Sequence, residues 1–152
     1  MLRFSNLFLF CFLFISFNAA FSKEIALTFD DAPRPASNLG AKQRTELLIQ
    51  ILSKAKVNKA LFFATTKHLT PENKSNLQAY ADAGHYIANH RDQHLWYNRT
   101  SINEYQQDFL TAHKKLKNFS TFQKIFRYPF LDEGRSQQKV KAMNFFLNRY
   151  GY

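Results

Sequence analysis

One stretch decides the fold. Residues 25–31 read IALTFDD, a short apolar run that ends in two adjacent carboxylates, Asp30 and Asp31. A near-continuous apolar run of this length predicts a buried strand of a parallel sheet. In α/β proteins, ligands and catalytic groups collect at the carboxyl ends of such strands. Two neighbouring like charges are unfavourable unless a cation lies beside them, so a metal ion is expected here.

The first residues predict a secretory signal. One positive charge at Arg3 precedes an apolar run over 7–17, and the small residues Ala20 and Ser22 have the spacing of a cleavage site. The alternative is an uncleaved membrane anchor, but the run is shorter than the roughly 20 residues that span a bilayer. We therefore expect a signal peptide over 1–22, one domain over 23–152, and export to the periplasm, cell envelope or exterior. The single cysteine, Cys11, lies within the signal, so the domain contains no disulfide.

The charge balance is strongly basic, with 21 Lys and Arg against 11 Asp and Glu. Such a balance favours anionic partners such as cell-wall polymers, membrane surfaces or nucleic acid. The basic residues are scattered, however, as in Lys114, Lys115 and Lys117. A solvated surface is therefore the preferred interpretation, and no nucleic-acid partner is expected.

Strand and helix patterns alternate along the rest of the chain. Apolar runs predict strands over 25–31, 59–65, 85–90 and 124–127. Helices are predicted between them, over 42–54, 70–84, 101–116 and 136–151. This alternation is typical of βα units, so we expect a parallel sheet or barrel.

Polar side chains follow three of these strands. The first strand ends in Asp30 and Asp31, the third in His90 with His94 four residues on, and the fourth in Arg127. Parallel strands would bring these residues to one rim. Two imidazoles and one carboxylate are a usual ligand set for a catalytic zinc-type site, although an H-x-x-x-H pair alone is a weak signal.

His68, His85 and His113 are expected to be surface histidines. Arg91, not Glu, follows His90. This argues against an H-E-x-x-H metallopeptidase, in which that Glu is the base.

With these residues in view, the chain resembles the polysaccharide deacetylases of the NodB-homology type, carbohydrate esterase family 4. Residues 25–31 resemble the first family motif, T-F-D-D; residues 84–94 resemble the second, N-H-(S/T)-x-x-H; residues 126–130 resemble the third, R-x-P-Y. The resemblance implies an incomplete (β/α) barrel of the family's distorted, seven-stranded, TIM-like type.

Several positions depart from the family pattern. Ala32 replaces a glycine, Arg91 replaces the Ser or Thr after the first histidine, and Phe130 replaces the tyrosine of the third motif. We expect Arg91 to place a bulky cation beside the metal.

The resemblance also implies a function: a metal-dependent hydrolase that removes N-acetyl groups from a glycan such as peptidoglycan, a chitin-like oligomer or an exopolysaccharide. It implies one divalent ion, zinc or else cobalt, nickel or manganese. For Asp30 a simple strand-end cap is the alternative to a catalytic role. The implied roles are metal binding by Asp31, His90 and His94, general base for Asp30, orientation of that base by Arg127, an oxyanion contact from the Phe130 backbone N–H, and substrate contacts by Tyr128 and Pro129.

Family members continue beyond the third motif to a last motif whose histidine protonates the leaving amine. The sequence has no histidine after His113, so we expect a shortened member with an exposed barrel edge that favours self-association. Two alternatives stay open: an inactive remnant that retains metal or glycan binding, and a basic surface protein with an unrelated role.

Overall fold

The computed structural model describes residues 24–152, so the predicted signal peptide lies outside the described part of the chain. None of the described helices combines the length and apolar character that crossing a membrane requires. The elements are β1 (Thr28–Ala32), α1 (Ala41–Lys54), β2 (Leu61–Ala64), α2 (Pro71–Asp82), β3 (Tyr86–Asn89), the 3-10 turn η1 (Tyr97–Arg99), α3 (Ile102–Leu116), β4 (Phe122–Phe126), the 3-10 turn η2 (Pro129–Leu131) and α4 (Gln137–Arg149).

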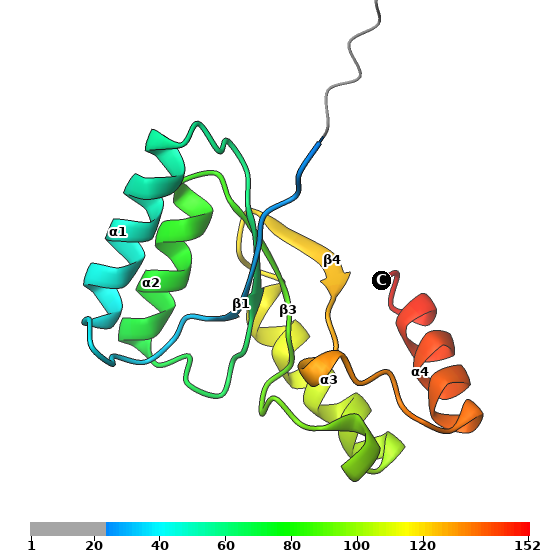
Figure 1. Cartoon of the computed structure of the whole chain (residues 1–152). Helices are drawn as coiled ribbons and strands as arrows, with labels where there is room; N and C mark the ends of the chain where they lie inside the picture. Colours follow the sequence, from blue (N-terminus) through cyan, green and yellow to red (C-terminus); the bar gives the residue numbers. More distant parts are fainter. Residues whose placement is uncertain (1–23) are drawn as a thin grey trace, which may run out of the picture.

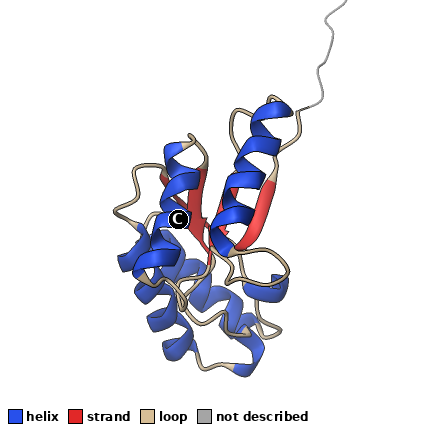
Figure 2. Cartoon of the chain, turned by 90° about the vertical axis from the view of Figure 1, so that its left-hand side faces the viewer, coloured by secondary structure: helices blue, strands red, loops and turns tan. Residues whose placement is uncertain are grey.

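The strands form one parallel sheet in the order β1-β2-β3-β4, which confirms the predicted α/β fold class. Each strand is followed by a helix. Helices α1 and α2 lie side by side against one side of the sheet, whereas α3 and α4 lie toward the other (Figure 1). Viewed from the side of α1 and α2, helices lie in front of the strands (Figure 2). In the described residues the barrel is therefore open, with four strands.

The sequence signals for helix ends agree with the structure. The side chain of Thr70 accepts a hydrogen bond from the Asn73 backbone N–H, and Pro71 is the first residue of α2. Ser101 caps α3 in the same way by accepting from the Glu104 N–H. These caps satisfy N–H groups that have no partner within the helix, and each contributes about 1 kcal/mol.

The core has two parts. In the first, the α1 and α2 side chains Leu52 and Leu77 pack on the sheet residues Phe62 and Ile87. The second part joins α3 to α4, and its buried members are Tyr97, Tyr105, Phe109, Met143 and Phe146. Burying each large apolar side chain contributes about 1.5–3 kcal/mol.

The first strand is less buried than the sequence predicts. We expected residues 25–31 to be buried, but β1 begins at Thr28, and only Ala32 of its residues is buried, whereas Thr28 and Asp30 are exposed. Ile25 is 84% exposed and precedes the strand. Among the described residues β1 pairs only with β2, so no strand pairs with its outer edge. Self-association through such an edge stays a prediction.

The histidine interpretation also needs one correction. His85 is buried, not exposed, and its Nδ1 accepts the backbone N–H of Ala60 at 3.3 Å. Burial lowers the pKa of His85, which favours the neutral ring that can accept this hydrogen bond. His68 is exposed as expected, and His113 is half-buried with its Nδ1 2.8 Å from the Tyr152 hydroxyl.

The side chain of Arg91 lies where the sequence did not predict it. We expected this cation beside the metal ligands, but it is fully buried against α3. Its Nε donates to Asp108 at 2.7 Å, and its Nη2 donates to the Tyr105 carbonyl at 2.6 Å. The guanidinium also stacks 3.1 Å from the centre of the Tyr105 ring.

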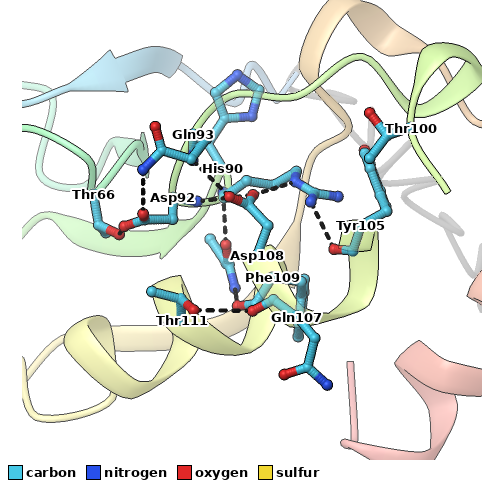
Figure 3. Close-up of polar contacts among 12 residues, drawn as sticks. Thr66, His90, Asp92, Gln93, Thr100, Tyr105, Gln107, Asp108, Phe109 and Thr111 are labelled. Carbon is cyan, nitrogen blue, oxygen red and sulfur yellow. Dashed lines mark hydrogen bonds and ion pairs between the residues drawn. The ribbon is translucent and has the colours of Figure 1, made fainter. Parts of the chain in front are cut away.

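Asp108 anchors the loop after β3 to α3. Besides Arg91, it accepts the backbone N–H groups of Asp92 at 3.2 Å and Gln93 at 2.9 Å. Figure 3 shows Asp108 below this loop, with the His90 ring pointing away from it. A second anchor is Asp92, which binds Lys115 Nζ at 2.6 Å. The segment that carries both candidate histidine ligands is therefore fixed to α3 by the ion pairs Arg91–Asp108 and Asp92–Lys115.

We predict that Asp108→Ala lowers the free energy of unfolding by about 3–5 kcal/mol, because it leaves the buried Arg91 charge without a partner. Urea denaturation followed by circular dichroism measures this change. The matched control is Asp82→Ala on the exposed face of α2, which should change the free energy by no more than about 0.5 kcal/mol. Equal, small losses in the two variants would contradict the anchoring role.

Candidate metal centre

The polar strand ends meet at one edge of the sheet. Asp30 and Asp31 lie in the last part of β1, His90 directly follows β3, and Arg127 directly follows β4. Because all neighbouring strands are parallel, their carboxyl ends share this edge. The predicted convergence is therefore present in the structure.

Both carboxylates reach this edge because β1 is irregular. Successive side chains of a regular strand point to opposite faces of a sheet. Here the pairing of β1 with β2 shifts register between Asp30 and Ala32, and Asp31 takes a left-handed backbone with φ 63°. Such a bulge re-aims a side chain. As a result Asp30 Oδ2 and Asp31 Oδ1 lie 4.0 Å and 3.8 Å from the same atom, His90 Nε2.

Three side chains form a candidate metal site. One ligand atom each from Asp31, His90 and His94 lies within 4.8 Å of the other two. The shortest of these contacts joins His94 Nε2 to Asp31 Oδ1 at 3.3 Å. One carboxylate and two imidazoles fit a zinc-type ion with a coordination position left open.

The orientation of His90 supports this assignment. Its Nδ1 lies 2.8 Å from the Arg127 carbonyl oxygen, which can only accept, so Nδ1 carries the proton. Burial lowers the pKa of His90, and the neutral ring then has a free lone pair on Nε2, the atom that faces the carboxylates. A carbonyl that fixes the tautomer of a histidine in this way is a common second shell of metal sites.

The backbone at the site is unusual. Asp31, Arg91, His94 and Phe130 all have positive φ angles, of 63°, 77°, 57° and 58°. Non-glycine residues adopt this region rarely, and such residues cluster at functional sites. Two of the three candidate ligands, Asp31 and His94, therefore have a strained backbone, and the third, His90, directly precedes the strained residue Arg91.

Asp30 belongs to a separate pair beside the metal ligands. Its Oδ1 accepts a hydrogen bond from Arg127 Nη1 at 2.8 Å. The same Nη1 also donates to the Thr28 hydroxyl at 3.0 Å, and the guanidinium lies 4.1 Å from the centre of the Phe63 ring. Arg127 therefore has contacts on several sides and pairs with the Asp30 carboxylate. That it orients a general base, as the resemblance implies, stays a prediction.

A cavity of about 440 Å³ opens over the candidate ligands. Asp31, His94 and Phe130 line it. Sequence reasoning missed two residues on its other wall: Thr65 and Arg34 donate to the Asp31 carboxylate at 3.2 Å and 3.3 Å. Arg34 lies in the Pro-rich loop after β1, and Thr65 directly follows β2. The one feature of the sequence that could have indicated them is their position just beyond the carboxyl end of a strand.

The residues of the third motif differ in their exposure and in what they pack against. The Phe130 ring is exposed and packs edge-on against His94, with centroids 4.7 Å apart. Pro129 is buried, and Tyr128 packs beside Tyr105 in the second core cluster. Burial also raises the pKa of the Tyr128 hydroxyl. We expected Tyr128 and Pro129 to contact substrate. Neither lines the cavity, and a substrate contact by either residue stays a prediction.

Comparisons with solved structures show the same fold. A peptidoglycan N-acetylglucosamine deacetylase, Bc1960, superposes with a TM-score of 0.66 at 22% identity over 83% of this chain and 53% of its own. A family 4 carbohydrate esterase from Streptomyces lividans gives 0.65 at 21% over 84% and 58%. A family 4 acetyl xylan esterase from Clostridium thermocellum, in complex with cobalt, gives 0.58 at 23% over 72% and 50%.

The chain spans between half and three fifths of the length of these structures. No curated protein sequence matches it significantly. The family model for polysaccharide deacetylase matches residues 18–148, which is most of the chain. The motifs, the parallel sheet and this match agree, and the chain belongs to the polysaccharide deacetylase family.

Proposed function

We propose that this chain carries the metal centre of an exported hydrolase that removes N-acetyl groups from a carbohydrate polymer or oligomer. One observation carries the proposal: the ligand atoms of Asp31, His90 and His94 converge beside the Asp30–Arg127 pair. Family membership and the fold shared with carbohydrate deacetylases and esterases support it. Export rests on the signal predicted over residues 1–22.

Asp31, His90 and His94 would hold one divalent ion, for which zinc is our first choice. The cobalt in the related acetyl xylan esterase supports a divalent metal of this kind. When bound, such an ion supplies a Lewis acid for amide hydrolysis. The donor set present in the chain fits it, because Asp31 offers a carboxylate and burial favours a neutral His90.

The other residues account for the proton and charge changes of the reaction. Water adds to the acetyl carbon and gives up one proton. The C–N bond then breaks as the amine nitrogen takes that proton, and acetic acid, which ionises to acetate, and a free amine leave. Asp30 accepts the proton of the attacking water; its side chain is 40% exposed, so water reaches it. Arg127 keeps that carboxylate aimed through its charge-assisted hydrogen bond. The backbone N–H of Phe130, a residue whose ring packs against His94, stabilises negative charge on the acetyl oxygen.

We predict that the full-length chain binds one equivalent of Zn²⁺ and that His94→Ala weakens the affinity more than about 100-fold, because a direct ligand is lost. Competition with a chromophoric chelator measures the affinity. The matched control is His68→Ala, which removes a histidine from the same cavity but not from the ligand set. Equal affinity in both variants would refute the assignment.

We predict that the zinc-loaded chain releases acetate from N-acetylated glycans and that Asp30→Asn slows this release by about 10² to 10⁴, because the general base is lost. Enzymatic quantification of acetate over peptidoglycan, chitin oligomers and an N-acetylated exopolysaccharide measures the rate. Zinc affinity should stay within about tenfold of the parent, since Asp30 is outside the ligand set.

Two results would count against this account. Full activity of the Asp30→Asn variant would show that Asp30 is not the general base. Zinc binding without acetate release from any of these glycans would favour the inactive remnant considered above.

A further inference from the structure

The cavity over the candidate metal ligands has a second wall. It is formed by the loop between β2 and α2, residues 65–70, from which Lys67 and His68 line the cavity. The candidate ligands Asp31 and His94 line the same cavity. The His68 side chain is exposed, so it is open to a molecule that occupies this space.

This loop is fixed to the segment that carries the histidine ligands. The backbone N–H of Thr66 donates to the Arg91 carbonyl at 3.0 Å, and that of Lys67 donates to the Asp92 carbonyl at 3.0 Å. The Thr66 hydroxyl also donates to the Asp92 carboxylate, and Figure 3 shows these two side chains side by side. Arg91 and Asp92 lie between the two candidate histidine ligands, so the loop keeps its position relative to the metal site.

The backbone of His68 is held as well. Its carbonyl oxygen accepts the backbone N–H of Thr70 at 2.8 Å and the side-chain amide of Asn73 at 3.0 Å. These two contacts tie the loop to the start of α2, and neither uses the imidazole ring. A side chain on a backbone fixed in this way loses less entropy when it binds a ligand.

Amide hydrolysis requires a proton donor as well as a base. An amine leaves only when its nitrogen takes up a proton, and a positioned general acid accelerates such a step by about 10² to 10⁴. The donor must face the bound substrate, exchange its proton near neutral pH and take no part in holding the metal ion.

One side chain of the cavity meets these three conditions. The polar side chains that line it belong to Asp31, Arg34, Thr65, Lys67, His68 and His94. Asp31 and His94 are candidate metal ligands, which bind an ion in their unprotonated forms. Arg34 and Thr65 donate to Asp31, and neither a guanidinium nor a hydroxyl gives up a proton near neutral pH. An ammonium such as that of Lys67 holds its proton more tightly than an imidazolium, which leaves His68.

We propose that His68 is the general acid of the reaction, the residue that protonates the leaving amine. This inference rests on the proposed function, because it requires an N-acetylated sugar over the metal centre. The cavity volume of about 440 Å³ is within the range of roughly 300–1,000 Å³ that small-molecule sites have, so it has room for such a sugar.

The proton transfers balance. Asp30 takes one proton from the attacking water. The His68 imidazolium then gives its ring proton to the amide nitrogen while the C–N bond breaks and its electron pair moves to nitrogen. Acetic acid and the free amine leave. Afterwards the neutral imidazole regains a proton from solvent, and Asp30 releases the proton that it took.

The test compares two substrates that differ in their need for a proton donor. The first is the N-acetylated glycan, given as chitin oligomers and as peptidoglycan, and the second is 4-nitrophenyl acetate, whose phenolate leaves without protonation. Acetate release is measured with the full-length chain and one equivalent of Zn²⁺, and the zinc-independent rate is subtracted. We expect His68→Gln to slow release from the glycan by about 10²-fold or more and to leave release from the ester unchanged.

Two comparisons make this result specific. Asp30→Asn should slow both substrates, because both reactions require deprotonation of the attacking water. The zinc affinity of His68→Gln should equal that of the parent, since His68 is outside the ligand set. An equal loss on both substrates in His68→Gln would assign the residue to another step and overturn the inference.

A second readout needs no turnover. The imidazole ¹⁵N signals of His68 are those that are missing from the spectrum of His68→Gln. We expect them to shift when a glucosamine disaccharide, the free-amine product, is titrated into the zinc-loaded chain. Signals that stay in place at saturating disaccharide would contradict a contact between His68 and the amine.

The failure of this inference differs from the failure of the proposed function. Full acetate release from the glycan by His68→Gln would leave the function standing and overturn the role of His68. No release from either glycan by the parent chain would contradict the function, and the role of His68 would fall with it.

Discussion

The site depends on one irregularity in β1. Two consecutive strand residues face opposite ways unless the pairing shifts between them, and here it shifts at Asp31. The shift allows one carboxylate to join the histidines while its neighbour binds Arg127. Without it, one of the two charges would point away from the edge, and the proposed general base and the candidate metal ligand could not serve the same substrate.

The second requirement is a rigid loop between the two histidines. His90 and His94 flank a segment in which the buried Arg91 side chain and the backbone N–H groups of Asp92 and Gln93 all donate to Asp108. The family pattern has a small hydroxyl residue where this chain has Arg91. The buried ion pair with Asp108 shows how the chain accommodates the larger residue: the cation turns into the core and away from the metal site, where it would repel a bound ion.

Much of this arrangement follows from the sequence, because strand ends and helix caps are local signals. The run before Asp30, the Thr70–Pro71 cap and the spacing of His90 and His94 predicted the α/β fold and the metal-ligand set that the structure brings together. What the sequence did not show depends on tertiary contacts. The direction of Arg91 required knowing that Asp108 on α3 faces it.

The same limit applies to the remaining corrections. The partial exposure of β1 depends on which strand lies at the edge, and the position of Tyr128 depends on Tyr97 and Tyr105, which stack beside it.

The central claim is that Asp31, His90 and His94 bind one metal ion beside Asp30. Anomalous diffraction at the zinc edge, from a crystal of the full-length chain grown with Zn²⁺, tests it most directly. The account predicts one strong peak about 2.0–2.2 Å from an oxygen of Asp31 and a nitrogen of each histidine, with Asp30 outside the coordination sphere. A peak at another place, or no peak while these three residues keep their positions, would contradict it.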